Sequence, residues 1–442
     1  MSYLPQAIFT LFLIAAGWFF ARNVGRIRRN ISIGRDVDRS DQPKRRWAIM
    51  ARVALGQGKM VARPVAGILH ILVYVGFVVI NIEVMEIVLD GLFGTHRLFA
   101  FIGPLYNALI WTFEWLAILV LVGCVIFLIR RNVLRIKRFW SKEMVKWPRS
   151  DANIILIAEI LLMMAFLMMN AADEVLQGYS MKVTYIKQAG SFPVSTFLFG
   201  FFEDIGMVKL VWIERGAWWF HIVGILAFLN YLPYSKHFHI LLAFPNTYYA
   251  NLDPKGRIEN MEAVTNEVKL MMDPSADPYA TPAPDAAPPE RFGAKDVFDL
   301  TWKNLMDAYS CTECGRCTSE CPANQTGKLL SPRKIMMDTR DRLEEVGKNI
   351  DKNGEFQDDG MSLIGGNISN EELWACTTCN ACTEACPINI DPLDIILQGR
   401  RYLVMEESNS PSELNGMFTN IENNGAPWQF AQADRLNWAT ED

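Results

Sequence analysis

The chain has 442 residues, of which 51% are hydrophobic, and its formal net charge is −5. Basic residues gather in short stretches between apolar runs and the rest of the chain is acidic, so the charge does not indicate nucleic-acid binding. The long apolar runs all lie before residue 250. We therefore predict two domains, a membrane domain over residues 1–250 and a soluble domain after it.

Five apolar segments each approach the ~20 residues that an α-helix needs to cross a bilayer. The first has no positive residue before it and no clear cleavage site after it, so we expect it to be retained and not removed as a signal peptide. The fold class that we predict is an all-α bundle of five transmembrane helices. The five segments are Leu4–Ala21, Val65–Leu89, Pro104–Ile129, Asn153–Ala171 and Ala217–Phe238.

The connections between these segments differ in charge. Residues 22–63 and 130–149 are rich in Arg and Lys, whereas residues 90–103 and 172–216 carry few of them. Basic connections stay on the cytoplasmic side of a membrane. The pattern predicts a multi-pass protein of the inner (cytoplasmic) membrane, with the N-terminus outside. Because five is odd, the C-terminal domain then lies in the cytoplasm.

Histidines are confined to the membrane half and the residues just after it. A neutral imidazole in a helical bundle is a common axial ligand of haem, although a lone one can instead hydrogen-bond a neighbouring helix. His70 and His239 lie at similar depths from the cytoplasmic edge, on the second and fifth segments. This pair predicts one haem b. The five histidines are His70, His96, His221, His237 and His239.

A second haem is an open alternative. His221 precedes His239 by about five helical turns, so both face the same way unless Pro233 kinks the helix, and His237 faces elsewhere. No histidine of the second segment matches the depth of His221, so an outer haem would have to recruit His96 or Met85. Otherwise His221 is an outer-side polar residue, which we place in a quinone pocket.

Acidic residues within the apolar segments are candidates for proton chemistry. Ionisable groups inside a membrane are costly and mark functional sites by default. Quinone reduction consumes two protons, and Glu83 and Glu114 are the candidates to deliver them. Glu86 and Asp90 lie toward the outer end of the second segment, where solvation at the interface explains them equally well.

The soluble half begins with a linker over residues 251–293, whose end is rich in Pro and Ala. A mostly helical domain over residues 294–405 follows, in which Ser331 and Pro332 mark a helix start. We assign residues 406–442 to a C-terminal extension that binds a partner.

Two cysteine runs in this domain share the pattern C-x2-C-x2-C-x3-C-P. This is the ligand spacing of a ferredoxin with two [4Fe–4S] clusters, in which the fourth cysteine ligates the other cluster. We therefore predict two clusters in a ferredoxin-like domain. The predicted ligands are Cys311, Cys314, Cys317 and Cys386 for the first cluster, and Cys376, Cys379, Cys382 and Cys321 for the second.

Two other interpretations of the cysteines carry less weight. Four thiolates also suit a structural zinc ion, but zinc sites usually show paired CxxC or Cys/His groups, and a zinc-stabilised scaffold would carry no electrons. Disulfides do not suit a reducing compartment. The ninth cysteine, Cys124, is expected to be a buried hydrophobe within the membrane.

The membrane half resembles the gamma subunits of nitrate reductase, which are five-helix haem b quinol oxidoreductases. The similar stretches are Gly67-Ile-Leu-His70-Ile, Phe220-His221-Ile-Val-Gly and Tyr234-Ser-Lys236-His-Phe-His239-Ile. In that family each haem takes one histidine from the second helix and one from the fifth. The resemblance implies that His70 pairs with His239, and the second helix lacks the histidine that an outer haem would need.

The soluble half resembles the iron-sulfur subunits of heterodisulfide-reductase-like and electron-transfer-flavoprotein:quinone-type complexes. The similarity runs through the first cysteine run and continues at Leu330-Ser-Pro332, Asn423–Trp428 and Arg435–Trp438. In fused relatives a cysteine-rich CCG domain follows. The resemblance implies a separate partner, either a CCG-domain protein or a flavin-containing redox protein.

Together these features predict a subunit of a membrane quinone oxidoreductase in respiratory electron transport. Electrons would pass between a cytoplasmic partner, two [4Fe–4S] clusters, haem b and a membrane quinone in the lipid bilayer. The resemblance favours quinone reduction as the direction. The alternative is an electron relay and membrane anchor with no quinone site of its own.

Overall fold

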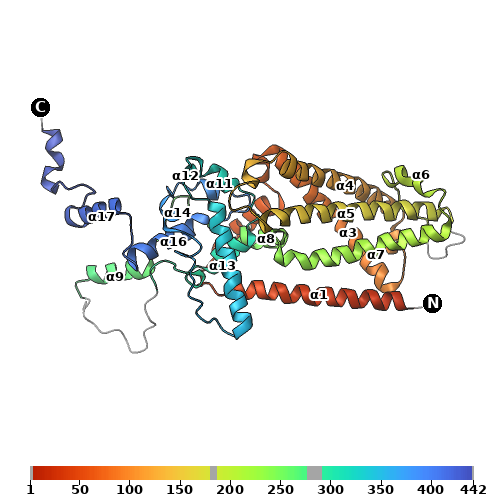
Figure 1. Cartoon of the computed structure of the whole chain (residues 1–442), viewed down its shortest axis with the longest axis horizontal. Helices are drawn as coiled ribbons and strands as arrows, with labels where there is room; N and C mark the ends of the chain where they lie inside the picture. The colour runs from red at the N-terminus through yellow and green to blue at the C-terminus, as the bar shows by residue number, and fades with distance from the viewer. Residues whose placement is uncertain (1–2, 180–186, 276–290, 441–442) are drawn as a thin grey trace.

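The computed structural model describes residues 3–179, 187–275 and 291–440. Across these ranges the chain is helical, and it forms two isolated β-bridges but no strand. The long helices make one elongated body and the shorter helices of the second half gather at one end of it (Figure 1). The predicted all-α class is confirmed.

Within the described residues, five helices are long and apolar enough to cross a membrane. The predicted number of spans is therefore confirmed. Four of the helices are longer than their apolar segments, and the third ends one residue before Ile129, where its segment ends. The helices are α1 (Leu4–Ile31), α3 (Pro64–Phe93), α4 (Pro104–Leu128), α5 (Trp147–Gln177) and α7 (Met207–Tyr231). Two of them continue into a further turn, α4 into η4 (Ile129–Val133) and α7 into η7 (Leu232–Tyr234).

Local sequence explains where these helices begin and end. Proline at the first position, as at Pro64 of α3, suits a helix start because its missing N–H would have no partner there. The same helix stops at Gly94, whose φ of +68° is a left-handed conformation that glycine adopts readily.

The bundle packs through α3, α4, α5 and α7, and α1 lies against α3 and α7. Its apolar core includes Phe9, Ile110, Phe113, Phe166 and Ile222. Most of α1 is exposed, as expected for a helix whose outer face contacts lipid.

Short helices connect the spans at both ends of the bundle. At the end near the second half lie α2 (Pro43–Met50), η1 (Ala51–Leu55), η2 (Met60–Ala62) and η5 (Lys137–Phe139). At the other end lie η3 (Leu98–Ile102), η6 (Ser195–Leu198) and α6 (Phe199–Phe202), on the side of the N-terminus (Figure 1).

Helix α7, which carries His221, ends before His239, so the two histidines do not share one helix. The expectation of a continuous helix is wrong, and the helix is interrupted at the anticipated residue, Pro233. Two short elements, η7 and η8 (Lys236–Phe238), separate α7 from α8 (His239–Tyr248).

The carboxylate of Asp151 on α5 fixes the turn between α7 and α8. It accepts hydrogen bonds from the Ser235 hydroxyl (2.7 Å) and from the Lys236 backbone N–H (3.1 Å). Because Pro233 has no N–H to continue the helix, this tertiary contact fixes an alternative turn.

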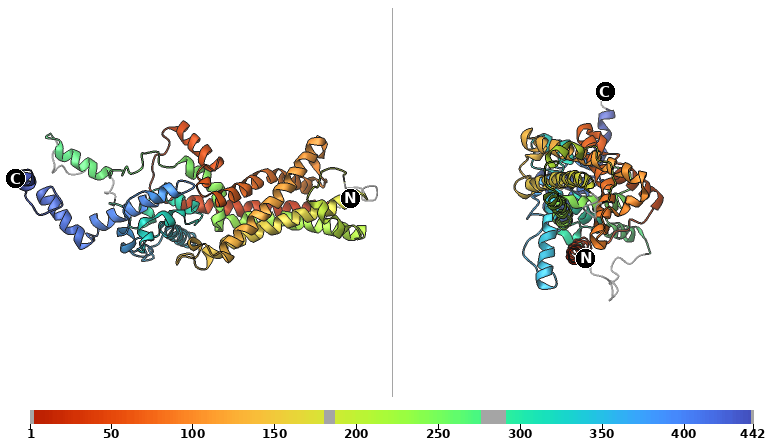
Figure 2. Two further views of the ribbon diagram at one scale, coloured as in Figure 1. Left: turned by 90° about the horizontal axis from the view of Figure 1, so that it is seen from above. Right: turned by 90° about the vertical axis from the view of Figure 1, so that its right-hand side faces the viewer.

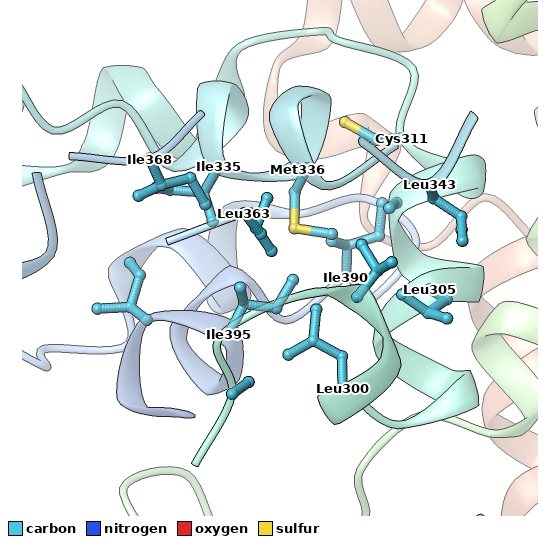
Figure 3. Packing of buried hydrophobic residues seen from close by; sticks show 14 of the residues in the cluster. Leu300, Leu305, Cys311, Ile335, Met336, Leu343, Leu363, Ile368, Ile390 and Ile395 are labelled. Carbon is cyan, nitrogen blue, oxygen red and sulfur yellow. The ribbon is translucent and has the colours of Figure 1, made fainter. Parts of the chain in front are cut away.

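The second half forms a compact helical domain, and a capping box at Thr301 and a cap at Ser331 start two of its helices. Buried Leu305, Ile335, Met336 and Ile395 form its core together with Cys311 (Figure 3). Its helices are α10 (Trp302–Ser310), α11 (Arg316–Glu320), α12 (Pro322–Gln325), α13 (Pro332–Asn353), α14 (Asn370–Trp374), α15 (Ala381–Ala385) and α16 (Pro392–Met405), preceded by η9 (Val297–Asp299).

Three further helices bury none of their residues. These are α9 (Glu262–Met272), which lies within the predicted linker, and α17 (Ser412–Asn424) and η10 (Gln432–Ala439) of the C-terminal extension. They project away from the body at the end opposite the N-terminus (Figures 1 and 2). Residues 276–290, near the end of the linker, lie outside the described residues.

The helical domain is docked on the basic connections of the bundle. Arg333 of α13 is fully buried and donates hydrogen bonds to the Arg138 carbonyl (2.6 Å) and the Glu143 carboxylate (2.6 Å), which both lie between α4 and α5. One apolar core also runs through both halves and includes Ile27 and Leu232. The two halves therefore share a buried interface.

Candidate redox centres

The first predicted group of cysteines surrounds one cavity. Cys311, Cys314, Cys317 and Cys386 line it together with Arg316 and Met336. Cys311 and Cys314 lie between α10 and α11, Cys317 lies in α11, and Cys386 follows α15 and precedes Pro387. The structure thus brings the last cysteine of the second run to the first three of the first run.

The second predicted group also converges. Burial and the neighbouring Cys321 and Cys379 raise the pKa of the Cys376 thiol, and burial together with Cys376 and Cys321 raises the pKa of the Cys382 thiol. Helix α11 packs against α15, so the two groups are neighbours. None of the cysteines in the described chain forms a disulfide.

The donor set of each group fits a [4Fe–4S] cluster. Four thiolates are available, and backbone N–H groups of Ile390 and Thr378 donate to the sulfurs of Cys386 (3.3 Å) and Cys376 (3.4 Å). Hydrogen bonds of this kind tune the potential of a bound cluster. Cys124 is buried in the core of the bundle, as expected.

Two histidines face each other where the bundle meets the helical domain. The rings of His70 on α3 and His239 at the start of α8 have centroids 6.3 Å apart. An imidazole nitrogen lies about 2 Å from the metal that it binds, so two imidazoles on opposite sides of one iron have centroids about 6 Å apart. The observed separation fits a haem held by both rings.

The ring nitrogens support the same arrangement. The Nδ1–H of His239 donates a hydrogen bond to the Lys236 carbonyl (3.0 Å), and this leaves Nε2 as the nitrogen free to bind a metal. Nδ1 of His70 is buried without a hydrogen-bond partner among the described residues.

Sequence reasoning missed His237. We expected it to face away, but its ring centroid lies 5.6 Å from that of His239 and 5.4 Å from that of Phe228. The cause is the chain break at Pro233, because a helical phase cannot be carried across it.

The structure places His221 apart from this pair. It is buried on α7, with Nδ1 2.9 Å from the Leu162 carbonyl and its ring 5.9 Å from that of Phe166. His96 and Met85, the two residues that an outer haem would have to recruit, lie in other surroundings. His96 pairs with Asp173 (3.2 Å) and accepts a hydrogen bond from the Lys187 backbone, and Met85 is 52% exposed on the outside of the bundle.

A cavity at the N-terminal end of the bundle is lined by charged side chains. Arg97 lies beside it and donates to Asp173 (2.6 Å), Tyr106 (3.1 Å) and Asn170 (3.1 Å). Glu83 also lines the cavity and is 3% exposed, and its Oε2 has no hydrogen-bond partner in the described ranges. The other lining residues include Glu86, Asp90, His96, Asp173, Glu214 and Trp218.

Glu114 has a different environment from Glu83. It is fully buried and accepts hydrogen bonds from Asn170 (3.1 Å), the backbone of Val194 (2.9 Å) and both the backbone (3.0 Å) and the hydroxyl of Ser195. These bonds hold η6 against the bundle. The structure therefore does not bring Glu83, Glu114 and His221 into one site.

Comparison with known protein families identifies the class of domain that the cysteines define. The family "4Fe-4S dicluster domain" matches residues 310–390, which contain all eight cysteines of the two runs. The chain thus combines a 4Fe–4S dicluster domain with five candidate membrane helices.

Curated proteins that resemble the chain over most of its length are iron-sulfur and quinone oxidoreductases. The chain is 28% identical to the iron-sulfur-binding oxidoreductase FadF of Bacillus subtilis, over 87% of this chain and 54% of that protein. It is 26% identical to the EtfAB:quinone oxidoreductase of Syntrophomonas wolfei, over 96% of this chain and 56% of that protein. The chain thus spans about half the length of these relatives.

A shorter similarity covers the cysteine domain. A component of the ferredoxin- and F420H2-dependent CoB-CoM heterodisulfide reductase of Methanosarcina acetivorans is 35% identical over 26% of this chain and 56% of that protein. No solved structure matches the chain. The similarities support electron transfer through iron-sulfur clusters.

Proposed function

We propose that this protein transfers electrons from a soluble redox partner to a membrane quinone. Two electrons leave the reduced partner, and the quinone gains these electrons and two protons to become quinol. The observation that carries the proposal is that the cavity of the first cysteine group and the His70–His239 pair lie at the same junction of the two halves. Bound [4Fe–4S] clusters and haem b supply one-electron carriers.

The cofactor ligands follow from the side chains that converge. Cys311, Cys314, Cys317 and Cys386 hold one cluster, and Cys376, Cys379, Cys382 and Cys321 hold the other. His70 and His239 hold one haem b, and Lys236 orients His239 by accepting its Nδ1–H. His221 has no histidine facing it in the described chain, so the proposal includes a single haem.

For the quinone, the cavity at the N-terminal end of the bundle is the proposed site of proton exchange. Glu83 is its acid–base group, because its carboxylate has an oxygen without a partner and is surrounded by ionisable side chains. His221 is proposed to lie beside this site, because it is one helical turn beyond Trp218, which lines the cavity. Glu114 supports the site by holding η6.

The proposed location is the cytoplasmic membrane, with the cysteine domain inside. The domain is docked on the two basic connections, which the positive-inside rule places in the cytoplasm. The N-terminus lies at the opposite end of the bundle (Figure 1).

The partner is proposed to be a flavin-containing or CCG-domain redox protein. One relative is named an EtfAB:quinone oxidoreductase and another is a subunit of a heterodisulfide reductase, and both names support a separate redox partner for this chain. The exposed α17 and η10 are proposed to bind it. Exposed Trp428, Phe430 and Trp438 give this extension the apolar side chains that a protein interface needs.

A cofactor measurement tests the proposal. Anaerobically purified protein is expected to contain about eight cluster irons with matching acid-labile sulfide, as two four-iron clusters require. Its reduced-minus-oxidised optical spectrum is expected to show one b-type haem per chain. Zinc in place of iron would contradict the proposal, and iron without haem would restrict the chain to a membrane-anchored ferredoxin. Loss of quinone reduction in Glu83→Gln supports a quinone site in this chain, whereas a purified wild-type chain that does not reduce a quinone favours the relay alternative.

A further inference from the structure

The two cysteine loops have the same backbone but differ in two side chains. Glu313 and Thr378 occupy the same place in their loops, with φ values of +53° and +54°. Gly315 and Asn380, at φ +70° and +60°, each precede a helix of five residues. In the second loop, Thr378 takes the place of Glu313 and Ala381 takes the place of Arg316. A loop of this shape therefore requires neither the carboxylate of Glu313 nor the guanidinium of Arg316.

The carboxylate of Glu313 joins the first loop to the turn before His239. It is buried and forms ion pairs with Lys236 and with Arg340 (2.7 Å). Lys236 also donates from Nζ to the Pro148 carbonyl (2.6 Å). The carbonyl of this same Lys236 accepts the Nδ1–H of His239. One residue thus binds the cysteine loop with its side chain and the histidine with its backbone.

The guanidinium of Arg316 joins the first loop to the helix of His70. It donates to the carbonyls of Lys59 (3.0 Å) and Met60 (3.3 Å). The Met60 carbonyl lies against Gly67 of α3, where a Cβ would approach it to 2.6 Å. Gly67 precedes His70 by about one helical turn. The second contact therefore leads to the other histidine.

The second loop has neither connection. The Thr378 hydroxyl donates to the carbonyl of Thr377 within its own loop (2.7 Å), and Ala381 has no polar side-chain atom. Cys379 of this loop is exposed, whereas its counterpart in the first loop, Cys314, is half-buried. The two loops thus face different surroundings.

We propose that Glu313 and Arg316 are positioning residues that fix the first cluster loop to both histidine-bearing elements. The first cluster is then the one that exchanges electrons with the membrane half, and the second, with its exposed Cys379, accepts them from the soluble partner. This inference rests on the proposed function and adds an order to it. In each transfer the reduced first cluster would give up one electron, and the haem held by His70 and His239 would gain it. Small displacements at such a junction matter, because about 1 Å is enough to slow a positioned step strongly.

The test replaces the two residues by those of the second loop. The full-length double variant Glu313→Thr/Arg316→Ala is prepared in lipid nanodiscs. The control is Asp351→Asn, which breaks the ion pairs between α13 and Arg26 and Arg29 of α1, away from both cysteine loops. Iron, sulfide and haem are measured per chain in all three proteins. Dithionite then reduces the clusters in a stopped-flow instrument, and the haem absorbance is followed.

We expect the double variant to keep its iron and haem, to reduce its clusters at the wild-type rate, and to reduce its haem at least about tenfold more slowly. Hydrogen exchange at residues 57–63 and 236–239 is expected to rise in the double variant and not in Asp351→Asn. If the double variant loses iron, the conservative Glu313→Gln and Arg316→Lys variants are measured in the same way, and each is expected to slow haem reduction to a smaller degree.

The outcomes separate this inference from the proposed function. If the variants reduce their haem at the wild-type rate and show the hydrogen exchange of the wild type, the positioning roles are overturned and the proposed function stands. Equal slowing in Asp351→Asn would also overturn them, since any loosening of the interface would then suffice. A wild-type protein that shows no haem, or no electron transfer to it, would overturn the proposed function itself.

Discussion

The centroids of the imidazole rings of His70 and His239 lie 6.3 Å apart. His70 is on a membrane helix, and His239 is the first residue of the helix that follows the bundle. This spacing leads to a prediction about haem content. His70→Ala and His239→Ala are each expected to abolish the b-type absorbance, since a haem iron with one axial ligand removed is no longer held by both elements. Optical spectra with pyridine haemochrome quantification measure the effect.

The matched change His221→Leu is expected to retain one haem per chain. Loss of half of the haem in this variant, starting from two per chain in the wild type, would contradict the single-haem assignment and make His221 a ligand.

The cysteine assignment predicts which cluster each substitution removes. Cys386→Ser is expected to lose about four irons per chain through the first cluster, although the residue belongs to the second run. Iron analysis and electron paramagnetic resonance of the reduced protein distinguish the two clusters. Cys386→Ser and Cys317→Ser should leave the same cluster signal, and Cys124→Ser should leave both. If Cys386→Ser and Cys376→Ser behaved alike instead, each run would hold its own cluster.

Glu83 is predicted to act in quinone reduction. Glu83→Gln removes the proton-transfer group but keeps the shape, so quinone turnover is expected to fall by about 100-fold with cluster and haem content unchanged. The assay is anaerobic oxidation of the reduced protein by a soluble naphthoquinone. Equal turnover in wild type and variant would remove Glu83 from the mechanism.

Glu114 is predicted to act on stability. It receives four hydrogen bonds while fully buried. Glu114→Leu leaves these donors without an acceptor, which costs about 2 kcal/mol or more of unfolding free energy. Thermal unfolding in detergent measures this loss. A variant as stable as the wild type but without quinone turnover would instead place Glu114 in proton delivery.

Arg333 is predicted to hold the two halves together. Arg333→Met leaves the partly buried Glu143 without its ion pair (2.6 Å), and breaking such a pair costs about 3 kcal/mol. Limited proteolysis is expected to separate the cysteine domain from the bundle more readily. The more exposed pair of Arg29 and Asp351 is the comparison, since Asp351→Asn should cost no more than about 1 kcal/mol. Equal effects of the two substitutions would show that Arg333 has no special part in docking.

Sequence patterns predicted the parts of this protein that depend on local chemistry. Apolar length alone identifies a membrane span, because every backbone polar group must be satisfied within a helix there. The cysteine spacing likewise predicted the dicluster domain, since the spacing of the four cysteines in each run is a local sequence pattern.

Features that depend on tertiary contacts were not predictable in this way. The turn that carries Lys236 is fixed by Asp151 on another helix, and His237 comes beside His239 only because of that turn. In the same way, the sequence pattern predicted Glu114 as a proton carrier, whereas in the structure its carboxylate accepts hydrogen bonds from Ser195. Residues far apart in the chain make these contacts, and no local pattern records them.

This chain is proposed to pass electrons from its clusters to a quinone without another subunit. The purified protein in nanodiscs is titrated with dithionite until both clusters and the haem are reduced, with no dithionite in excess, and a naphthoquinone is then added anaerobically. The clusters and the haem are expected to be reoxidised together, with one quinol formed for every two electrons released. Clusters that stay reduced in the presence of the quinone would contradict this proposal.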